Sequence, residues 1–223
     1  MIKQKKKKKR LKFKRLFLLL LFLAVISFVC IKFVDIPIMN ITIKGNEILS
    51  DQDIIEQAKL ENYPSFFSTF SFKVKQELMK NPYINEAKVY KGILNVKIEV
   101  KENTVLYIDK ETNEKVTENS KIKDDKIVCA PFLINEVPND KKDGFIKALK
   151  KIDKDILCQM SQIKYDPNEI DKDRYYVYMN DGNGVYLTVN KFNKINKYND
   201  ILESIGKQNG ILYLDYGDYF EVK

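Results

Sequence analysis

The amino-acid sequence predicts an α+β protein with three parts: a single N-terminal transmembrane helix, a β-α-α-β-β unit, and a mostly antiparallel β domain with two helices. Three observations lead to this prediction. An apolar run, Leu16 to Ile31, follows a short basic tail. Apolar and polar residues alternate strictly from Leu94 to Val100, which is typical of a half-buried strand. Apolar residues at helical spacing occur in 141–162 and again in 192–205.

Positive charge is concentrated at the start of the chain. Residues 1–15 hold ten Lys or Arg and no acidic residue. Subtracting these ten from the 39 Lys and Arg of the whole chain leaves fewer than its 31 Asp and Glu. The basic character therefore belongs to the tail, which argues against a nucleic-acid-binding domain with its basic surface on the folded part. We expect no nucleic-acid partner.

The segment 16–34 is predicted to be an uncleaved membrane anchor. Its sixteen-residue apolar run contains one polar residue, Ser27, and would span about 24 Å as a helix. Arg15 and Lys32 extend it by snorkelling, and the small residues of a signal-peptidase site do not follow. The basic tail 1–15 then stays in the cytoplasm and everything after the anchor lies outside. The residues predicted to form the membrane anchor include Leu16, Leu20, Ile26 and Ile31.

The segment 36–104 is predicted to hold five elements in the order β-α-α-β-β. Ile41–Ile43 form a short strand closed by a Gly45-Asn46 turn. Ser50 caps the first helix by accepting the free N–H of Asp53. A second helix, Phe72–Lys80, ends at Asn81-Pro82. Two strands follow, Ile84–Tyr90 and Leu94–Val100, joined by Lys91-Gly92.

The segment 105–223 is predicted to be the β domain. The hairpin signal Asn180–Gly184 connects two of its strands. Its two helices are Lys141–Gln162 and Phe192–Ile205, the second ended by Gly206. The predicted strands are Leu106–Asp109, Ile127–Ala130, Tyr175–Met179, Val185–Val189 and Ile211–Tyr216.

The sequence predicts no catalytic, cofactor-binding or metal-binding site. It has no histidine, nucleophile elbow, Walker loop or dinucleotide-binding motif. The acidic group Asp166, Glu169, Asp171 and Asp173 lacks the glycine and terminal glutamate of an EF-hand loop, so we interpret it as a solvated loop. A membrane-anchored cell-wall hydrolase or transferase is the alternative, because any two carboxylates could serve it; the lack of tryptophan for sugar stacking disfavours it.

The cysteines leave two states open. Cys30 lies in the apolar run, and Cys129 and Cys158 lie in the exported part. One disulfide between the latter two, or two free thiols, both fit an extracytoplasmic chain.

The opening Ile41–Asn46, the stretch Asn81–Val89 and the strand Leu94–Glu102 resemble, in this order, the POTRA domain of the FtsQ/DivIB family. The proline that family members often carry after the terminal glutamate is absent from Asn103-Thr104-Val105. The resemblance extends over most of the chain and implies a non-enzymatic scaffold of the bacterial divisome that supports septum assembly and septal peptidoglycan synthesis. It implies a single-pass type II protein of the cell membrane at the division septum. The implied partners are FtsL-like and FtsB/DivIC-like bitopic division proteins and the septal peptidoglycan synthase complex.

The resemblance also places the main partner at the C-terminal strand, Ile211–Tyr216. A strand at a sheet edge has unpaired N–H and C=O groups that can accept an added strand. Alternation predicts that the leucines of this strand pack inward. We therefore expect partner contacts from Tyr213, Asp215, Tyr219 and Phe220, with thermal stability little changed by truncating Tyr213 or Phe220. The alternative is that this strand merely closes the fold and its tyrosines cover the sheet.

Overall fold

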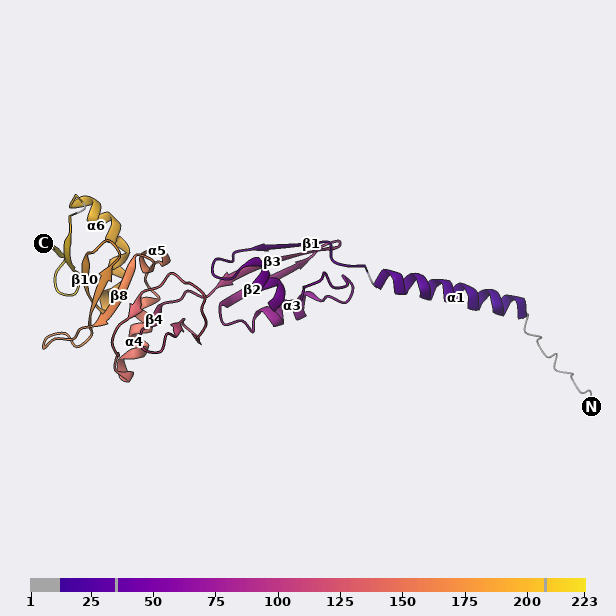
Figure 1. The fold of residues 1–223 in the computed structure, drawn as a ribbon, viewed down its shortest axis with the longest axis horizontal. Helices are drawn as coiled ribbons and strands as arrows, with labels where there is room; N and C mark the ends of the chain where they lie inside the picture. Colours follow the sequence, from indigo (N-terminus) through magenta and orange to yellow (C-terminus); the bar gives the residue numbers. More distant parts are fainter. Residues whose placement is uncertain (1–12, 35, 207) are drawn as a thin grey trace, which may run out of the picture.

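The computed structural model describes residues 13–34, 36–206 and 208–223 (Figure 1). Most of the basic tail predicted at 1–15 therefore lies outside the described residues. Helix α1, Phe13–Val34, stands apart from the folded units, and the four predicted anchor residues Leu16, Leu20, Ile26 and Ile31 lie exposed on it. Over the described residues alone, no helix reaches the length and apolar character that crossing a membrane requires. The transmembrane anchor stays a prediction of the sequence.

The first folded unit has the predicted β-α-α-β-β order. Its elements are β1 (Asn40–Lys44), α2 (Asp51–Gln57), α3 (Ser71–Leu78), β2 (Ile84–Lys91) and β3 (Asn95–Glu102). The sheet order is β1-β3-β2, with β1 parallel and β2 antiparallel to the central strand β3. Alternate residues of β3, among them Val96, Ile98 and Val100, are buried in this unit's hydrophobic cluster. The strand predicted by strict alternation is thus the central one.

Polar contacts hold the loop before α2 in place and cap the first turn of this helix. Ser50 accepts the N–H of Asp53, and the Asp53 carboxylate accepts the N–H of Ser50 in return, which completes a capping box. The predicted Ser50 cap is confirmed. At the end of β3, the Glu102 carboxylate accepts the N–H groups of Ile48 (2.7 Å) and Leu49 (2.9 Å). Glu102 therefore ties the last strand of this unit to the loop before its first helix.

The second folded unit is built on a nine-stranded mixed sheet with the order β12-β11-β10-β9-β8-β7-β4-β5-β6. The pairs β4–β7, β7–β8 and β10–β11 are parallel, and the others are antiparallel. The strands are β4 (Tyr107–Asp109), β5 (Lys115–Val116), β6 (Lys121–Ile122), β7 (Phe132–Leu133), β8 (Met160–Tyr165), β9 (Arg174–Met179), β10 (Gly184–Thr188), β11 (Gly210–Tyr213) and β12 (Tyr219–Val222). The helices are α4 (Asn139–Leu149), α5 (Lys154–Leu157), the 3₁₀ helix η1 (Val189–Lys197) and α6 (Tyr198–Ser204).

Two elements predicted for this unit are wrong. The helix expected over 141–162 ends at Leu149, and its last residues belong to strand β8. Pairing of β8 with β9, which buries Ile163, outweighs the helical spacing in that stretch. No strand forms at Ile127–Ala130; the strand comes after Pro131, as β7. The predicted helix over 192–205 forms as η1 followed by α6.

Aromatic packing fills the core between this sheet and its helices. The ring of Phe145 on α4 stacks on Tyr175 of β9 with centroids 4.7 Å apart. Phe192 on η1 meets both rings edge-on, at 6.0 Å and 5.3 Å. All three side chains are fully buried. These contacts fix α4 and η1 on one face of the sheet, which leaves the opposite face of β9 to other side chains.

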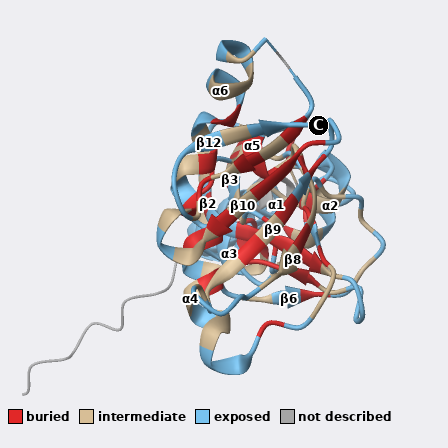
Figure 2. Ribbon diagram, turned by 90° about the vertical axis from the view of Figure 1, so that its left-hand side faces the viewer, coloured by how far each residue is buried: buried red, intermediate tan, exposed pale blue. Residues whose placement is uncertain are grey.

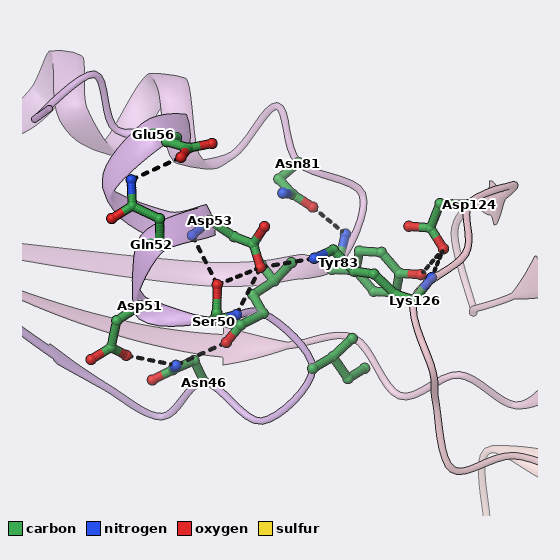
Figure 3. Close-up of polar contacts among 12 residues, drawn as sticks. Asn46, Ser50, Asp51, Gln52, Asp53, Glu56, Asn81, Tyr83, Asp124 and Lys126 are labelled. Carbon is green, nitrogen blue, oxygen red and sulfur yellow. Dashed lines mark hydrogen bonds and ion pairs between the residues drawn. The ribbon is translucent and has the colours of Figure 1, made fainter.

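The end of β6 and the chain between β6 and β7 pack against the first unit, and we call this stretch the joining segment. Ile122, Val128 and Ala130 pack with the hydrophobic cluster of the first unit. Lys126 forms an ion pair with Asp53 (2.8 Å), and the hydroxyl of Tyr83 donates to Asp124 (3.0 Å) (Figure 3).

Charge and covalent bonding reinforce this junction. The hydrogen bonds from Lys126 and Ser50 lower the pKa of Asp53 to about 2. Cys129 is joined to Cys158 by a disulfide, with the Cα atoms 5.1 Å apart. Of the two states that the sequence left open, the structure contains the disulfide, and it fastens the joining segment to the residue after α5.

Candidate functional site

One edge of the large sheet is formed by β12, a strand that the sequence analysis did not predict (Figure 2), and the other by β6. The expectation that Ile211–Tyr216 lies at the edge is wrong, because β11 ends at Tyr213 and is paired on both sides, with β10 and β12. The chain reverses after β11 through Gly217, whose φ of +92° suits glycine. It then returns as Tyr219–Val222, antiparallel to β11. Among the described residues, no strand pairs with the outer side of β12.

The backbone of β12 offers hydrogen-bonding groups on its free side. Lys223 N–H donates to the Asn209 carbonyl (2.9 Å), on the side of β11. In an antiparallel pair, alternate residues direct their N–H and C=O groups to the same neighbour. Glu221 therefore faces β11, and the N–H and C=O groups of Phe220 and Val222 point to the open side. An extended peptide could pair with these groups.

A row of tyrosine rings crosses the sheet and ends at this edge. The strand register places Tyr176, Tyr186, Tyr213 and Tyr219 directly opposite one another on β9 to β12. Neighbouring ring centroids lie 4.6, 5.2 and 4.5 Å apart along this row. Tyr178 adds a fifth ring, 4.7 Å from Tyr176. We call these five residues the tyrosine row.

Arg174 and Asp215 support the row from one side. The Arg174 guanidinium lies 3.6 Å from the ring centroid of Tyr186, a cation–π contact. Its Nε lies 3.0 Å from a carboxylate oxygen of Asp215, and both side chains are largely buried. Asp215, predicted as a partner contact, is thus held by a charge within the protein.

The four predicted partner residues differ in how far their side chains are exposed to solvent and free of contacts within the protein. Tyr219 is 51% exposed. Tyr213 is half-buried and donates its hydroxyl to Glu221 (2.9 Å); this bond, followed by burial, raises the pKa of Tyr213 to about 12. Phe220 packs against the core, as do Leu212 and Leu214, whose predicted inward packing is confirmed. The side chain most open to a partner is therefore Tyr219.

Sequence reasoning missed β12, Arg174 and the tyrosine row. A signal for β12 was present: Gly217-Asp218 is a turn pair, and it lies between two stretches rich in aromatic and β-branched residues. The row had no such signal. Its members are up to 43 positions apart in the sequence, from 176 to 219, and only the strand register aligns them.

Three members of the acidic group at 166–173 make contacts within the protein. Asp166 pairs with Lys164, and Asp173 pairs with Lys141. The Asp171 carboxylate accepts the N–H of Asp173. Within the described residues, no cluster of three or more His, Cys, Asp or Glu side chains is arranged to hold a metal ion.

Known proteins resemble both parts of this architecture. A family model described as "POTRA domain, FtsQ-type" matches residues 36–103, the β-α-α-β-β unit. The cell division protein DivIB of Bacillus subtilis is 25% identical over 186 residues, which cover 79% of this chain and 71% of the relative. DivIB of Geobacillus kaustophilus is 29% identical with the same coverage. The β-α-α-β-β unit is thus similar to the FtsQ-type POTRA domain, and the longer matches are to DivIB proteins of the FtsQ/DivIB family.

Other relatives of this family are longer than the matched region. DivIB of Staphylococcus pseudintermedius is 30% identical over 70% of this chain, and the match spans about half of that relative, 54%. A solved structure of the major extracytoplasmic domain of DivIB from Geobacillus stearothermophilus has a TM-score of 0.37 and 27% identity. That match covers 45% of this chain and 90% of the solved domain. The relatives that this chain matches are cell division proteins, and this similarity supports a role of the chain in bacterial cell division.

Proposed function

We propose that this chain is a protein of the FtsQ/DivIB family and a non-enzymatic scaffold of the divisome that recruits FtsL-like and FtsB/DivIC-like bitopic proteins to the septal peptidoglycan synthase complex. The free edge of β12, with the exposed ring of Tyr219 beside it, is the observation that supports the proposal most directly. A partner segment that adds a strand there gains backbone hydrogen bonds, and its side chains extend the tyrosine row.

The proposal includes the membrane topology. Helix α1 anchors the chain as a single-pass type II protein of the cell membrane, with the tail 1–15 in the cytoplasm and the domains 36–104 and 105–223 outside, at the septum. The support is the apolar run of α1, its exposed apolar side chains and the basic residues before it. No observation on the described residues favours the alternative of a cell-wall hydrolase or transferase.

One substitution pair tests the edge directly. Val222→Pro removes an N–H that points to the open side of β12, whereas Val222→Ala keeps this N–H and removes only exposed side-chain atoms. We expect Val222→Pro to weaken binding of the DivIC-type partner about tenfold, the equivalent of about 1.4 kcal/mol, while Val222→Ala binds as the natural protein does.

Binding is measured with the full chain in lipid nanodiscs and the partner's extracytoplasmic segment in solution. Thermal melts of both variants establish that the fold is intact. Equal partner affinity of Val222→Pro and the natural protein, with equal melting temperatures, would mean that the partner does not pair with β12.

A further inference from the structure

Exposed apolar side chains gather at one end of the β-α-α-β-β unit, far from the tyrosine row. They come from the residue before β1, the α2–α3 loop with the first turn of α3, and the β2–β3 turn. Phe72 is 65% exposed and Ile93 is 91% exposed. The members of this apolar end are Met39, Tyr63, Phe67, Phe70, Phe72 and Ile93.

Hydrogen bonds hold the three segments together. The Lys91 ammonium, at the end of β2, donates to the Thr69 carbonyl in the α2–α3 loop (2.8 Å). Met39 N–H donates to the Leu94 carbonyl in the β2–β3 turn (2.7 Å). The apolar end is thus one surface made by segments distant in the sequence, rather than three separate loops.

This surface lies next to the point where α1 joins the unit. Phe66 N–H donates to the Ile36 carbonyl (2.8 Å), and Ile38 N–H donates to the Pro64 carbonyl (3.1 Å). Only two peptide steps separate Val34, the last residue of α1, from Ile36, which is at most ~7 Å of chain. The backbone of the aromatic loop is therefore within roughly 12 Å of the end of α1. Figure 1 shows the α2–α3 loop at the end of the unit that faces α1.

Charge around the apolar end is positive. Residues 62–76 contain Lys73 and Lys75 and no acidic residue. Lys73 lies 5.4 Å from the ring centroid of Phe70, and Lys91 lies 4.0 Å from that of Phe66. The acidic residues that flank this stretch are Glu61 and Glu77, and Glu77 is paired with Lys59 and Lys80. Aromatic rings with interleaved lysines are the composition that binds the interface of an anionic bilayer.

We propose that the apolar end docks on the outer surface of the lipid bilayer and seats the first unit on the membrane. The inference rests on the proposed anchoring by α1, because the short connection leaves this end of the unit at the bilayer surface once α1 is inserted. Phe67, Phe70 and Phe72 enter the boundary between headgroups and acyl chains, and the lysines contact anionic headgroups. Docking restricts how the first unit can tilt relative to α1.

Single tryptophan substitutions test the docking, because the natural chain has no tryptophan. The full chain is reconstituted in nanodiscs of phosphatidylcholine and phosphatidylglycerol, with or without bromine on the upper acyl carbons. Phe72→Trp and Phe67→Trp place probes in the apolar end, so that failure of one variant to fold leaves the other. Ile170→Trp is the control, at an 89% exposed position of the second unit. Phe22→Trp reports whether α1 is in the bilayer.

We expect brominated lipid to quench both probes of the apolar end about twofold and the Ile170→Trp probe not at all, because an interfacial side chain lies ~5–10 Å deep. Lys73→Ser should reduce the quenching at position 72. If the Phe22→Trp probe is quenched and the apolar-end probes behave like the Ile170→Trp control, docking is refuted while the anchor stands. An unquenched Phe22→Trp probe refutes the anchor instead. Apolar-end probes that are shielded only after the bitopic partner is added, without quenching, would assign this surface to a protein.

Discussion

Replacing Tyr213 with alanine should destabilise the second unit, because the ring of this residue lies between two other rings of the tyrosine row. The substitution removes the stacked contacts with Tyr186 (centroids 5.2 Å apart) and Tyr219 (4.5 Å). Each such pair contributes about 0.5–1.5 kcal/mol, so the free energy of unfolding should fall by about 2 kcal/mol. At roughly 2–4 °C per kcal/mol, the melting temperature should fall by about 4–8 °C. This revises the expectation, drawn from the sequence, that truncating Tyr213 leaves stability unchanged.

Two further variants isolate the cause. Tyr213→Phe keeps both ring contacts and loses only the hydrogen bond to Glu221, so it should melt within about 2 °C of the natural protein. Tyr216→Ala truncates a tyrosine that is 85% exposed and lies outside the row, and it should have no measurable effect. Melting is followed by circular dichroism on the full chain in detergent. If Tyr213→Ala and Tyr216→Ala melt at the same temperature, the row does not stabilise the sheet, and the reasoning is refuted.

Three other outcomes follow from the first unit and the junction. Glu102→Ala should lower the free energy of unfolding by about 2 kcal/mol in denaturant melts, because the N–H groups of Ile48 and Leu49 lose a charged acceptor; the exposed neighbour variant Lys101→Ala should leave it unchanged. The pKa of Asp53 is lowered from 3.8 to about 2, so its ion pair stabilises the fold above pH 3.8 and is lost as the pH falls through 2. Because Asp53 is one-third exposed, this contribution is about 1 kcal/mol at most, and it should disappear from the acid melts of Asp53→Asn. Reduction of the Cys129–Cys158 disulfide, which spans 29 residues, should lower the free energy of unfolding by about 3.5 kcal/mol; free thiols in the folded natural protein, found by peptide mapping without reductant, would contradict this.

The sequence by itself determined the local features of this protein. Strict alternation in 94–100 located the central strand of the first unit, and Ser50 with Asp53 located the start of α2. Both depend on residues that are close along the chain, where side-chain spacing and capping chemistry act directly. The anchor prediction has the same basis, since hydropathy is a property of a continuous segment.

Only the tertiary structure decided which segments meet. The helix predicted from apolar spacing included residues 160–162, yet these residues join the sheet because pairing with β9 satisfies their backbone and buries Ile163. The segment 211–216 was predicted to be an edge strand, whereas the observed edge strand is β12. The reason is similar, because strand order depends on contacts between distant parts of the chain. The tyrosine row and the apolar end of the first unit are both assembled from separated segments. Their side chains become neighbours through strand register and loop hydrogen bonds, which no local pattern in the sequence encodes.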